Sequence, residues 1–242
     1  MMRRGRRYTW MMAPVLAVFL AGCCDDNQVL GVQQGGTGGP GAVPLATSGT
    51  FAILAGSTVT NTGATAVTGD LGVSPGSAVI GFPPGTVSGV IHVNDTAAVQ
   101  AKSDLTVAYN DAAGRTTGAI SVSGDLTGLT MTPGLYKSTS SLAISGALTL
   151  NALGDPSAKF IIQIASTLTT GPGSQVILSG GALASNVIWQ VGTSATLGTN
   201  SDFKGTILAD QSITLTTGAS LNGRAMARIG AVTLDTNAIV IP

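Results

Sequence analysis

The 242-residue sequence contains no glutamate and one histidine, and only 9% of its residues are charged. Enzymes that cleave polysaccharides on a β-helical scaffold need paired carboxylates, or calcium together with a basic residue. Asp70, Asp125 and Asp155 lie in Gly-Asp or Asp-Pro turns, and His92 directly precedes a predicted helix, where it is expected to cap or pack. The composition therefore argues against an enzyme.

Cysteine is equally scarce, because Cys23 and Cys24 are the only two and both lie near the N-terminus. The rest of the chain can form neither a disulfide nor a cysteine metal site. The Gly-Asp turns are not accompanied by the repeat of calcium-binding β-rolls. We therefore expect no metal and no cofactor.

Positive charge is concentrated at the start of the chain, where Arg3, Arg4, Arg6 and Arg7 lie. Without these four, seven of the eleven basic residues remain against eleven aspartates, a net charge near −4. A weakly acidic domain with scattered lysine and arginine does not favour nucleic acid as a partner.

Residues 1–23 are predicted to be an export signal. The arginines are followed by an apolar core, Trp10–Leu20, which is too short to span a bilayer comfortably. The segment Leu20-Ala21-Gly22-Cys23 resembles the lipobox of bacterial lipoproteins, which implies that Cys23 becomes the lipidated first residue. The alternative is an ordinary signal peptide cut nearby. We expect an exported protein, held at the cell envelope by its lipid or otherwise secreted, with no other membrane contact.

Residues 24–44 are rich in glycine and glutamine, which predicts a flexible tether. One domain is expected to follow, from about residue 45 to 242. Within it, a short sequence motif recurs at steps of 18 and 19 residues, as Ser194–Leu197, Ser212–Leu215 and Ala231–Leu234. An interval of this length is too short for helical repeats and suits the coils of a β-solenoid with three short strands per coil. The fold class predicted is mainly β, a parallel β-helix with one helix along a side.

The helix is expected over residues 95–113, capped by Asn94 or Asp95. A stripe of small apolar residues at spacings of 3 and 4 marks its buried face: Ala98, Ala101, Leu105, Ala108 and Ala112. The near-continuous apolar runs 160–164, 187–191 and 207–209 are typical of strands buried on both faces. We expect the helix to cover these strands, on what we call the helix side.

Two sides of each coil remain exposed. The second side is expected to carry charge, with Asp202 and Lys204 in one coil and Ser220 and Asn222 in the next. The hydroxyl side is expected to carry no lysine or arginine, with Asp235 only at its margin, since apolar and hydroxyl residues alternate along its strands. Its outward positions are predicted to be Thr149, Thr167, Thr169, Ser194, Thr196, Ser212, Thr214, Thr216, Ala231 and Thr233.

An uncharged exposed β surface is unusual, because charge normally keeps such surfaces soluble. High β propensity of threonine offers a purely structural explanation. As a functional surface, it would be a rigid lattice repeating at about 4.8 Å between strands and about 6.6 Å along each strand. Its methyl groups favour ordered water and its hydroxyls can anchor that water, so crystalline water is a plausible ligand. Polysaccharide is the competing ligand, but its sites usually offer aromatic rings, and Trp189 belongs to the buried side.

Several dispersed segments agree in order with one known family. They are Phe51–Ala55 through Val67–Pro75, Thr132–Tyr136, Val187–Val191, Asn222–Arg224 and Gly230–Asp235. Together they resemble the microbial ice-binding (antifreeze) proteins of bacteria, fungi and algae, over about residues 45–242. The resemblance implies a discontinuous right-handed β-helix of triangular cross-section with a long helix alongside. It also implies that one flat side binds ice.

In this family the N-terminal coil lies next to the C-terminal coil. Ser57, Thr58 and Thr60 would then extend the hydroxyl side beside Ala231 and Thr233. Some members insert a capping segment before the helix, but the stretch 75–93 is short and we expect little or no cap. The implied function is a non-catalytic, monomeric protein that adsorbs to ice and inhibits its growth and recrystallisation. The alternative is a cell-surface adhesin that binds polysaccharide.

Overall fold

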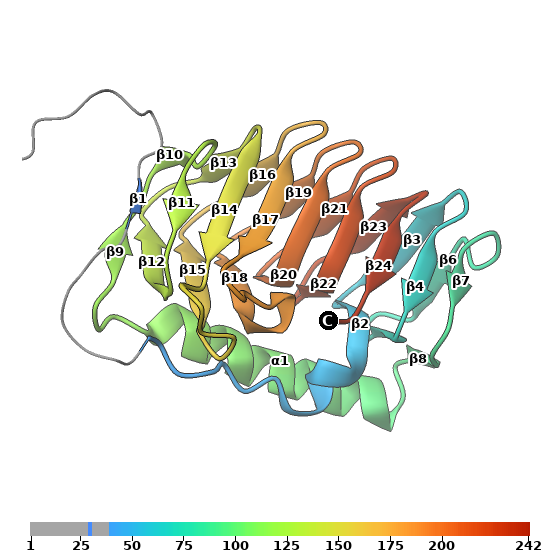
Figure 1. Ribbon diagram of the computed structural model, residues 1–242. Helices are drawn as coiled ribbons and strands as arrows, with labels where there is room; N and C mark the ends of the chain where they lie inside the picture. The colour runs from blue at the N-terminus through green and yellow to red at the C-terminus, as the bar shows by residue number, and fades with distance from the viewer. Residues whose placement is uncertain (1–28, 31–38) are drawn as a thin grey trace, which may run out of the picture.

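Short parallel strands stack coil upon coil into a solenoid with three flat sides, and one helix runs along it (Figure 1). The computed structural model describes residues 29–30 and 39–242. Every strand pairing in this part of the chain is parallel. The predicted β-helix with one flanking helix is thus confirmed.

The hydroxyl side is a sheet of eight strands, one from each coil. In spatial order it consists of β10 (Gly124–Asp125), β13 (Leu142–Ile144), β16 (Leu168–Thr170), β19 (Ala195–Leu197), β21 (Ile213–Leu215), β23 (Val232–Asp235), β3 (Thr58–Thr62) and β6 (Ala78–Ile80). Apolar residues of these strands, such as Ile213 and Val232, point into the core and are fully buried.

The other two sides belong to one sixteen-stranded sheet. The second side consists of β1 (Val29–Leu30), β11 (Thr130–Met131), β14 (Ala147–Asn151), β17 (Gln175–Ser179), the first halves of β20 (Asp202–Ala209) and β22 (Ser220–Ala227), β24 (Ala238–Val240), β4 (Ala66–Thr68) and β7 (Thr86–Val87). The helix side consists of β9 (Ile120–Ser121), β12 (Gly134–Ser138), β15 (Phe160–Ile164), β18 (Val187–Val191), the second halves of β20 and β22, β2 (Phe51–Ala55), β5 (Asp70–Val73) and β8 (Ile91–Val93).

The long strands β20 and β22 each serve two sides, and their corner falls at a pair of stacked glycines. Gly205 and Gly223 are neighbours in the ladder, and a Cβ at Gly223 would lie 1.9 Å from the Gly205 carbonyl oxygen. Gly205 also has a φ of +109°, a conformation that favours glycine. Both positions therefore require glycine if the two coils are to turn this corner in register.

The first coil in the sequence stacks on the last one. β2 pairs with β22, β3 with β23 and β4 with β24, so all three sides continue across this junction. Figure 1 shows β3 and β4 beside β23 and β24. The predicted neighbourhood of the two terminal coils is therefore present, and the residues after Pro75 build a further coil, β6 to β8, rather than a separate cap.

Inward-pointing side chains form one continuous apolar core. Trp189 is fully buried in it, with its ring centroid 5.0 Å from that of Phe203 and its indole N–H donating to the Lys204 carbonyl. The only polar group of that indole is thus satisfied, which removes most of the cost of burying it. Trp189 is therefore a core residue and is not available as a carbohydrate platform.

Helix α1 (Thr96–Gly114) begins after Asp95, whose carboxylate accepts a hydrogen bond from the Ala98 N–H at 2.9 Å. Every residue of the predicted stripe is fully buried. From Ala101 to Ala112, the stripe packs with residues of the helix side, namely Leu135, Ile161, Ile188, Leu208 and Met226. At the C-terminal end of α1 the Gln163 amide donates to the carbonyls of Ala112 and Arg115, both at 2.7 Å. The small residues thus let the helix lie close to the sheet. Gln163 of β15 fixes the last turn of the helix by these hydrogen bonds.

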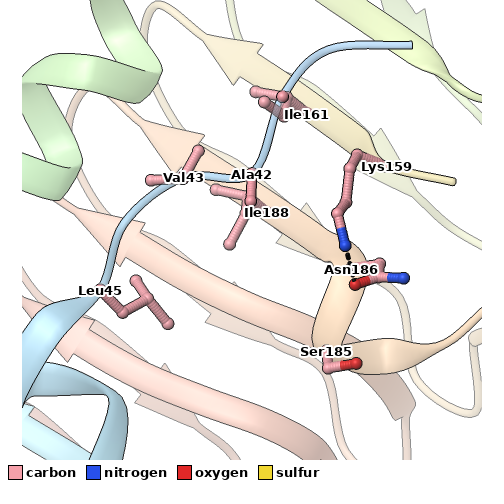
Figure 2. A pocket seen from close by; sticks show the side chains of 9 residues that line it. Ala42, Val43, Leu45, Lys159, Ile161, Ser185, Asn186 and Ile188 are labelled. Carbon is pink, nitrogen blue, oxygen red and sulfur yellow. Dashed lines mark hydrogen bonds between the residues drawn. The ribbon is translucent and has the colours of Figure 1, made fainter. Parts of the chain in front are cut away.

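Part of the segment predicted as a tether is packed against the domain. β1 adds to the edge of β11, and Val43 is buried in the cluster beneath the helix. The Arg115 guanidinium donates to the carbonyl oxygens of Gly41 and Ala42. Figure 2 shows this segment passing over Ile161 and Ile188, where a cavity of about 40 Å³ remains. The expectation of a free tether up to residue 44 is therefore wrong for residues 39–44, because Val43 packs into an apolar groove with Ile161 and Ile188.

The predicted export signal, Cys23 and the remaining tether residues lie outside the described part of the chain.

Two short 3-10 turns precede strands of the helix side. The first, η1 (Ala46–Thr50), leads into β2, and the second, η2 (Ala184–Asn186), precedes β18. None of the helices in residues 29–30 and 39–242 has the length and hydropathy needed to cross a bilayer.

Candidate functional site

Five threonines form a straight row down the middle of the hydroxyl side. Thr169 pairs with Thr196, Thr196 with Thr214, Thr214 with Thr233, and Thr233 with Thr60 on the next strand. We call these five residues the threonine column. Because each pair is joined by parallel ladder hydrogen bonds, their spacing is set by the strand separation of about 4.8 Å. The backbone thus fixes a regular row of identical side chains.

The hydroxyls of the threonine column have no hydrogen-bond partner among the described residues. Among residues 39–242, none of the five makes a hydrogen bond to another protein group, and all five side chains are exposed or half-buried. The residues that alternate with them, such as Ala195 and Leu197, are buried, so the column cannot turn inward. Each threonine therefore presents a methyl group and an unpaired hydroxyl to solvent.

The row beside the column behaves differently, because the hydroxyls of Thr167, Ser194 and Ser212 bond to neighbouring coils. Thr167 donates to the Ser141 hydroxyl at 2.8 Å. The Ser194 hydroxyl accepts from the Ser212 N–H at 3.3 Å, and that of Ser212 accepts from the Ala231 N–H at 3.2 Å. These contacts tie successive coils together at the corner. These hydroxyls therefore stiffen the surface, and they are less available to a ligand than those of the threonine column.

Most of the predicted surface residues lie on or next to the strands of the hydroxyl side. These are Thr58, Thr60, Thr167, Thr169, Ser194, Thr196, Ser212, Thr214, Thr216, Ala231 and Thr233. Thr216 donates to the Leu197 carbonyl at 2.8 Å, so its hydroxyl is bonded to a neighbouring coil, as are the hydroxyls of Ser194 and Ser212. Ser57 is exposed in the turn before β3, at the rim of the surface.

Thr149 is not on this side, contrary to expectation. It lies in β14 on the second side, paired with Thr130 and Ile177. The hydroxyl-side position of its coil is Ala143, which pairs with Thr169. Turns such as the one containing η2 make the coils at this end longer than those that carry the repeated motif. Counting backwards from Thr169 by the shorter interval therefore ends on another side.

The column continues at both ends into residues that the sequence did not single out. Ala143 follows Thr169 and is paired with Asp125, while Ile80 follows Thr60 at the other end. The alternation in Leu142-Ala143-Ile144 and Ala78-Val79-Ile80 carries a strand signal, but without threonine it is easily overlooked. The described hydroxyl side thus has a charged end at Asp125 and an apolar end at Ile80.

Asp125 is occupied by its own turn. Its carboxylate accepts from the Thr127 hydroxyl at 2.6 Å and from the N–H groups of Thr127 and Ser145. Burial alone would raise the pKa of Asp125, but the hydrogen bonds from Ser145 and Thr127 outweigh it and lower the pKa to about 2. The group therefore stays ionised and places a charge at this end of the row that contains the threonine column.

The two charges expected on the second side, Asp202 and Lys204, lie there on β20, next to Ser220 and Asn222 of β22. Along its middle row lie Thr130, Thr149, Ile177, Lys204, Asn222, Val240 and Thr68. Lys204 is paired with Asp202 of the same strand, with 2.6 Å between nitrogen and oxygen. Among the described residues, charge in the middle row and in the neighbouring row of Asp202 is thus confined to β20. What distinguishes the hydroxyl side is its regularity, since it repeats one residue type over five consecutive strands.

A family model described as Ice-binding-like matches residues 53–240, which is most of the chain. This chain belongs to the ice-binding protein family. An ice-binding protein of Nostoc sp. (strain HG1) is 51% identical over 196 residues, covering 81% of this chain and 72% of that protein. An ice-binding protein of Colwellia sp. is 38% identical over 220 residues, covering 84% of this chain and 85% of that protein.

Solved structures of ice-binding proteins share the fold. The crystal structure of one from an Antarctic biological consortium superimposes with a TM-score of 0.85 at 58% identity, covering 88% of this chain and 96% of that chain. One from the Antarctic ascomycete Antarctomyces psychrotrophicus gives a TM-score of 0.80 at 39% identity, covering 83% and 98%. Membership of the ice-binding family agrees with a non-enzymatic binding protein and gives no support to the adhesin alternative.

Proposed function

We propose that this member of the ice-binding family adsorbs to ice through the hydroxyl side, with the threonine column as the centre of the contact. Adsorption slows the growth of the crystal and inhibits recrystallisation. The observation that carries the proposal is a row of five threonines in register whose hydroxyls have no partner among the described residues.

The physical basis is preorganisation of water. A methyl group favours an ordered water shell, and a free hydroxyl next to it can take a place in that shell as donor and acceptor. Because the ladder holds the column rigid, little conformational entropy remains to be lost when the surface meets ice. The flanking hydroxyls of Ser194 and Ser212 support this by bonding to adjacent coils.

Partition into a slowly growing ice hemisphere tests the proposal directly. The purified protein should enter the ice, and Thr196→Lys or Thr233→Lys should be left in the liquid, because a charge at the contact must be desolvated. Circular dichroism should show an unchanged fold, since both side chains point outward. Exclusion of the folded wild-type protein from the ice would contradict the proposal.

The proposed place of action is the outside of the cell, with Cys23 as a lipid anchor and the domain as a monomer. The short stretch from Cys23 to Val29 can span at most about 20 Å. Since β1 joins the edge strand β11, an anchored protein would keep that end of the solenoid near the membrane. A protein held in this way can bind a cell to ice or shield its envelope.

Metabolic labelling with a fatty-acid probe tests the anchor. The wild type and Cys24→Ala should incorporate the probe, whereas Cys23→Ala should not. Labelling that persists in Cys23→Ala would place the lipid elsewhere, and unlabelled wild-type protein in the culture medium would show that it is secreted. Light scattering of the purified domain tests the monomer.

A further inference from the structure

The coil next to the helix start extends the threonine column with an apolar residue. β6 pairs with β3 so that Ile80 lies beside Thr60 and Ala78 beside Thr58. Ile80 is 57% exposed, whereas Val79 between these two residues packs against the core. The alternation along β6 therefore directs Ile80 to the same surface as the column.

Isoleucine and threonine are alike in the part of the side chain that the column displays. Both are branched at Cβ, and both carry a methyl group there. The row of methyl groups therefore continues from Thr60 to Ile80, while the row of hydroxyls stops at Thr60. Since β6 adds one more strand at the ladder spacing, it lengthens the flat surface by about 4.8 Å.

Solubility does not explain an isoleucine at this position. A large apolar side chain on an exposed edge strand promotes association with other protein molecules, and proteins usually prevent this with charged residues nearby. The stretch 75–93 contains no lysine, arginine or aspartate. The opposite end of the same row carries Asp125, so the two ends of the surface differ in chemical character.

We propose that Ile80, with Ala78 beside it, is a contact residue for ice and forms the apolar end of the ice-binding surface. The proposal rests on the proposed function and extends it to a coil without threonine in its hydroxyl-side strand. An ordered water layer would lie over the Ile80 methyl groups and be anchored by the hydroxyl of Thr60 on the neighbouring strand.

The test compares two lysine variants of the full mature protein. Ile80→Lys places a charge at the end of the column. Val90→Lys is the matched control, because Val90 belongs to the same coil and is also 57% exposed, but lies in the turn between β7 and β8. Thermal hysteresis should fall about twofold or more in Ile80→Lys, since its charge must be desolvated against ice, and should stay at the wild-type level in Val90→Lys.

Ile80→Val, which keeps the branched methyl groups, should retain wild-type hysteresis. Ile80→Asn, a smaller polar change, should lose activity in the same direction as Ile80→Lys and serves if the lysine variant does not fold. Wild-type hysteresis in folded Ile80→Lys and Ile80→Asn, together with its loss in Thr214→Lys, would overturn this contact and leave the proposed function intact. A folded wild type without hysteresis would overturn both.

Discussion

Thr60 and Thr233 lie side by side on parallel strands although they come from opposite ends of the domain sequence. Their pairing joins the first coil of the domain to the last and completes the threonine column. The surface proposed to bind ice therefore depends on a long-range contact between the two ends of the domain. A repeat array that simply ended at β24 would present a column one threonine shorter.

Gly56 is a position of this junction where the backbone leaves no room for a side chain. Its N–H donates to the Gly230 carbonyl, and a Cβ on Gly56 would lie 2.3 Å from the Ile229 carbonyl oxygen. Because the nearest atoms all belong to the backbone and cannot swing away, Gly56→Ala should lower the free energy of unfolding by about 1–3 kcal/mol. Chemical denaturation measures this change.

Gly114→Ala is the control for the glycine experiment, since no atom beyond its chain neighbours and the local helix backbone lies within 4 Å of a Cβ at that position. Its stability should match that of the wild type or exceed it slightly, because alanine favours the helix. Equal stability of Gly56→Ala and Gly114→Ala would show that the coil junction can shift to make room.

Thr149→Tyr should leave ice recrystallisation inhibition at the wild-type level. Thr149 lies on the second side, so a bulky side chain there does not reach a crystal that is held by the threonine column. The prediction is measured at several protein concentrations, with the fold checked by circular dichroism. A strong loss of inhibition would mean that the second side also touches ice.

Acid should weaken the end of the hydroxyl side at Asp125. The pKa of this carboxyl is lowered from 3.8 to about 2 in the folded protein, so its stabilising contribution is complete above pH 3.8 and is lost as the pH falls through about 2. Asp125→Asn should therefore show a smaller decrease of stability across this pH interval than the wild type does. Denaturation curves at a series of acidic pH values test this, and parallel curves for both proteins would contradict it.

Local sequence patterns predict the parts of the fold that repeat strictly. The nearly constant interval of the repeated motif places Thr196, Thr214 and Thr233 in the correct register, because the corners between these coils have nearly constant length. The spacing of small residues from Ala98 to Ala112 likewise predicts the buried stripe of α1. Where the period is regular, side-chain direction follows from the backbone alone.

The errors have physical causes that no short window of sequence contains. Thr149 is misplaced because the corners of its coils vary in length, so the register cannot be counted backwards. Composition assigns Val43 to a tether, whereas the groove that buries it is built from distant residues such as Ile188. The distinction between free and engaged hydroxyls depends on neighbouring coils. Thr196 and Ser212 are both outward hydroxyl positions in the sequence, but of the two only the Ser212 hydroxyl has a hydrogen-bond partner in the part of the chain that the structure describes.

The most direct measurement of the central claim is ice recrystallisation inhibition by the wild type, Thr214→Tyr and Thr68→Tyr. Thr214 lies in the middle of the threonine column, whereas Thr68 is an exposed threonine on β4 of the second side. Thr214→Tyr should need at least about a tenfold higher concentration for the same inhibition, as expected for a central contact residue. Thr68→Tyr should act like the wild type. Equal inhibition by all three folded proteins would contradict the assignment of the threonine column as the ice-binding surface.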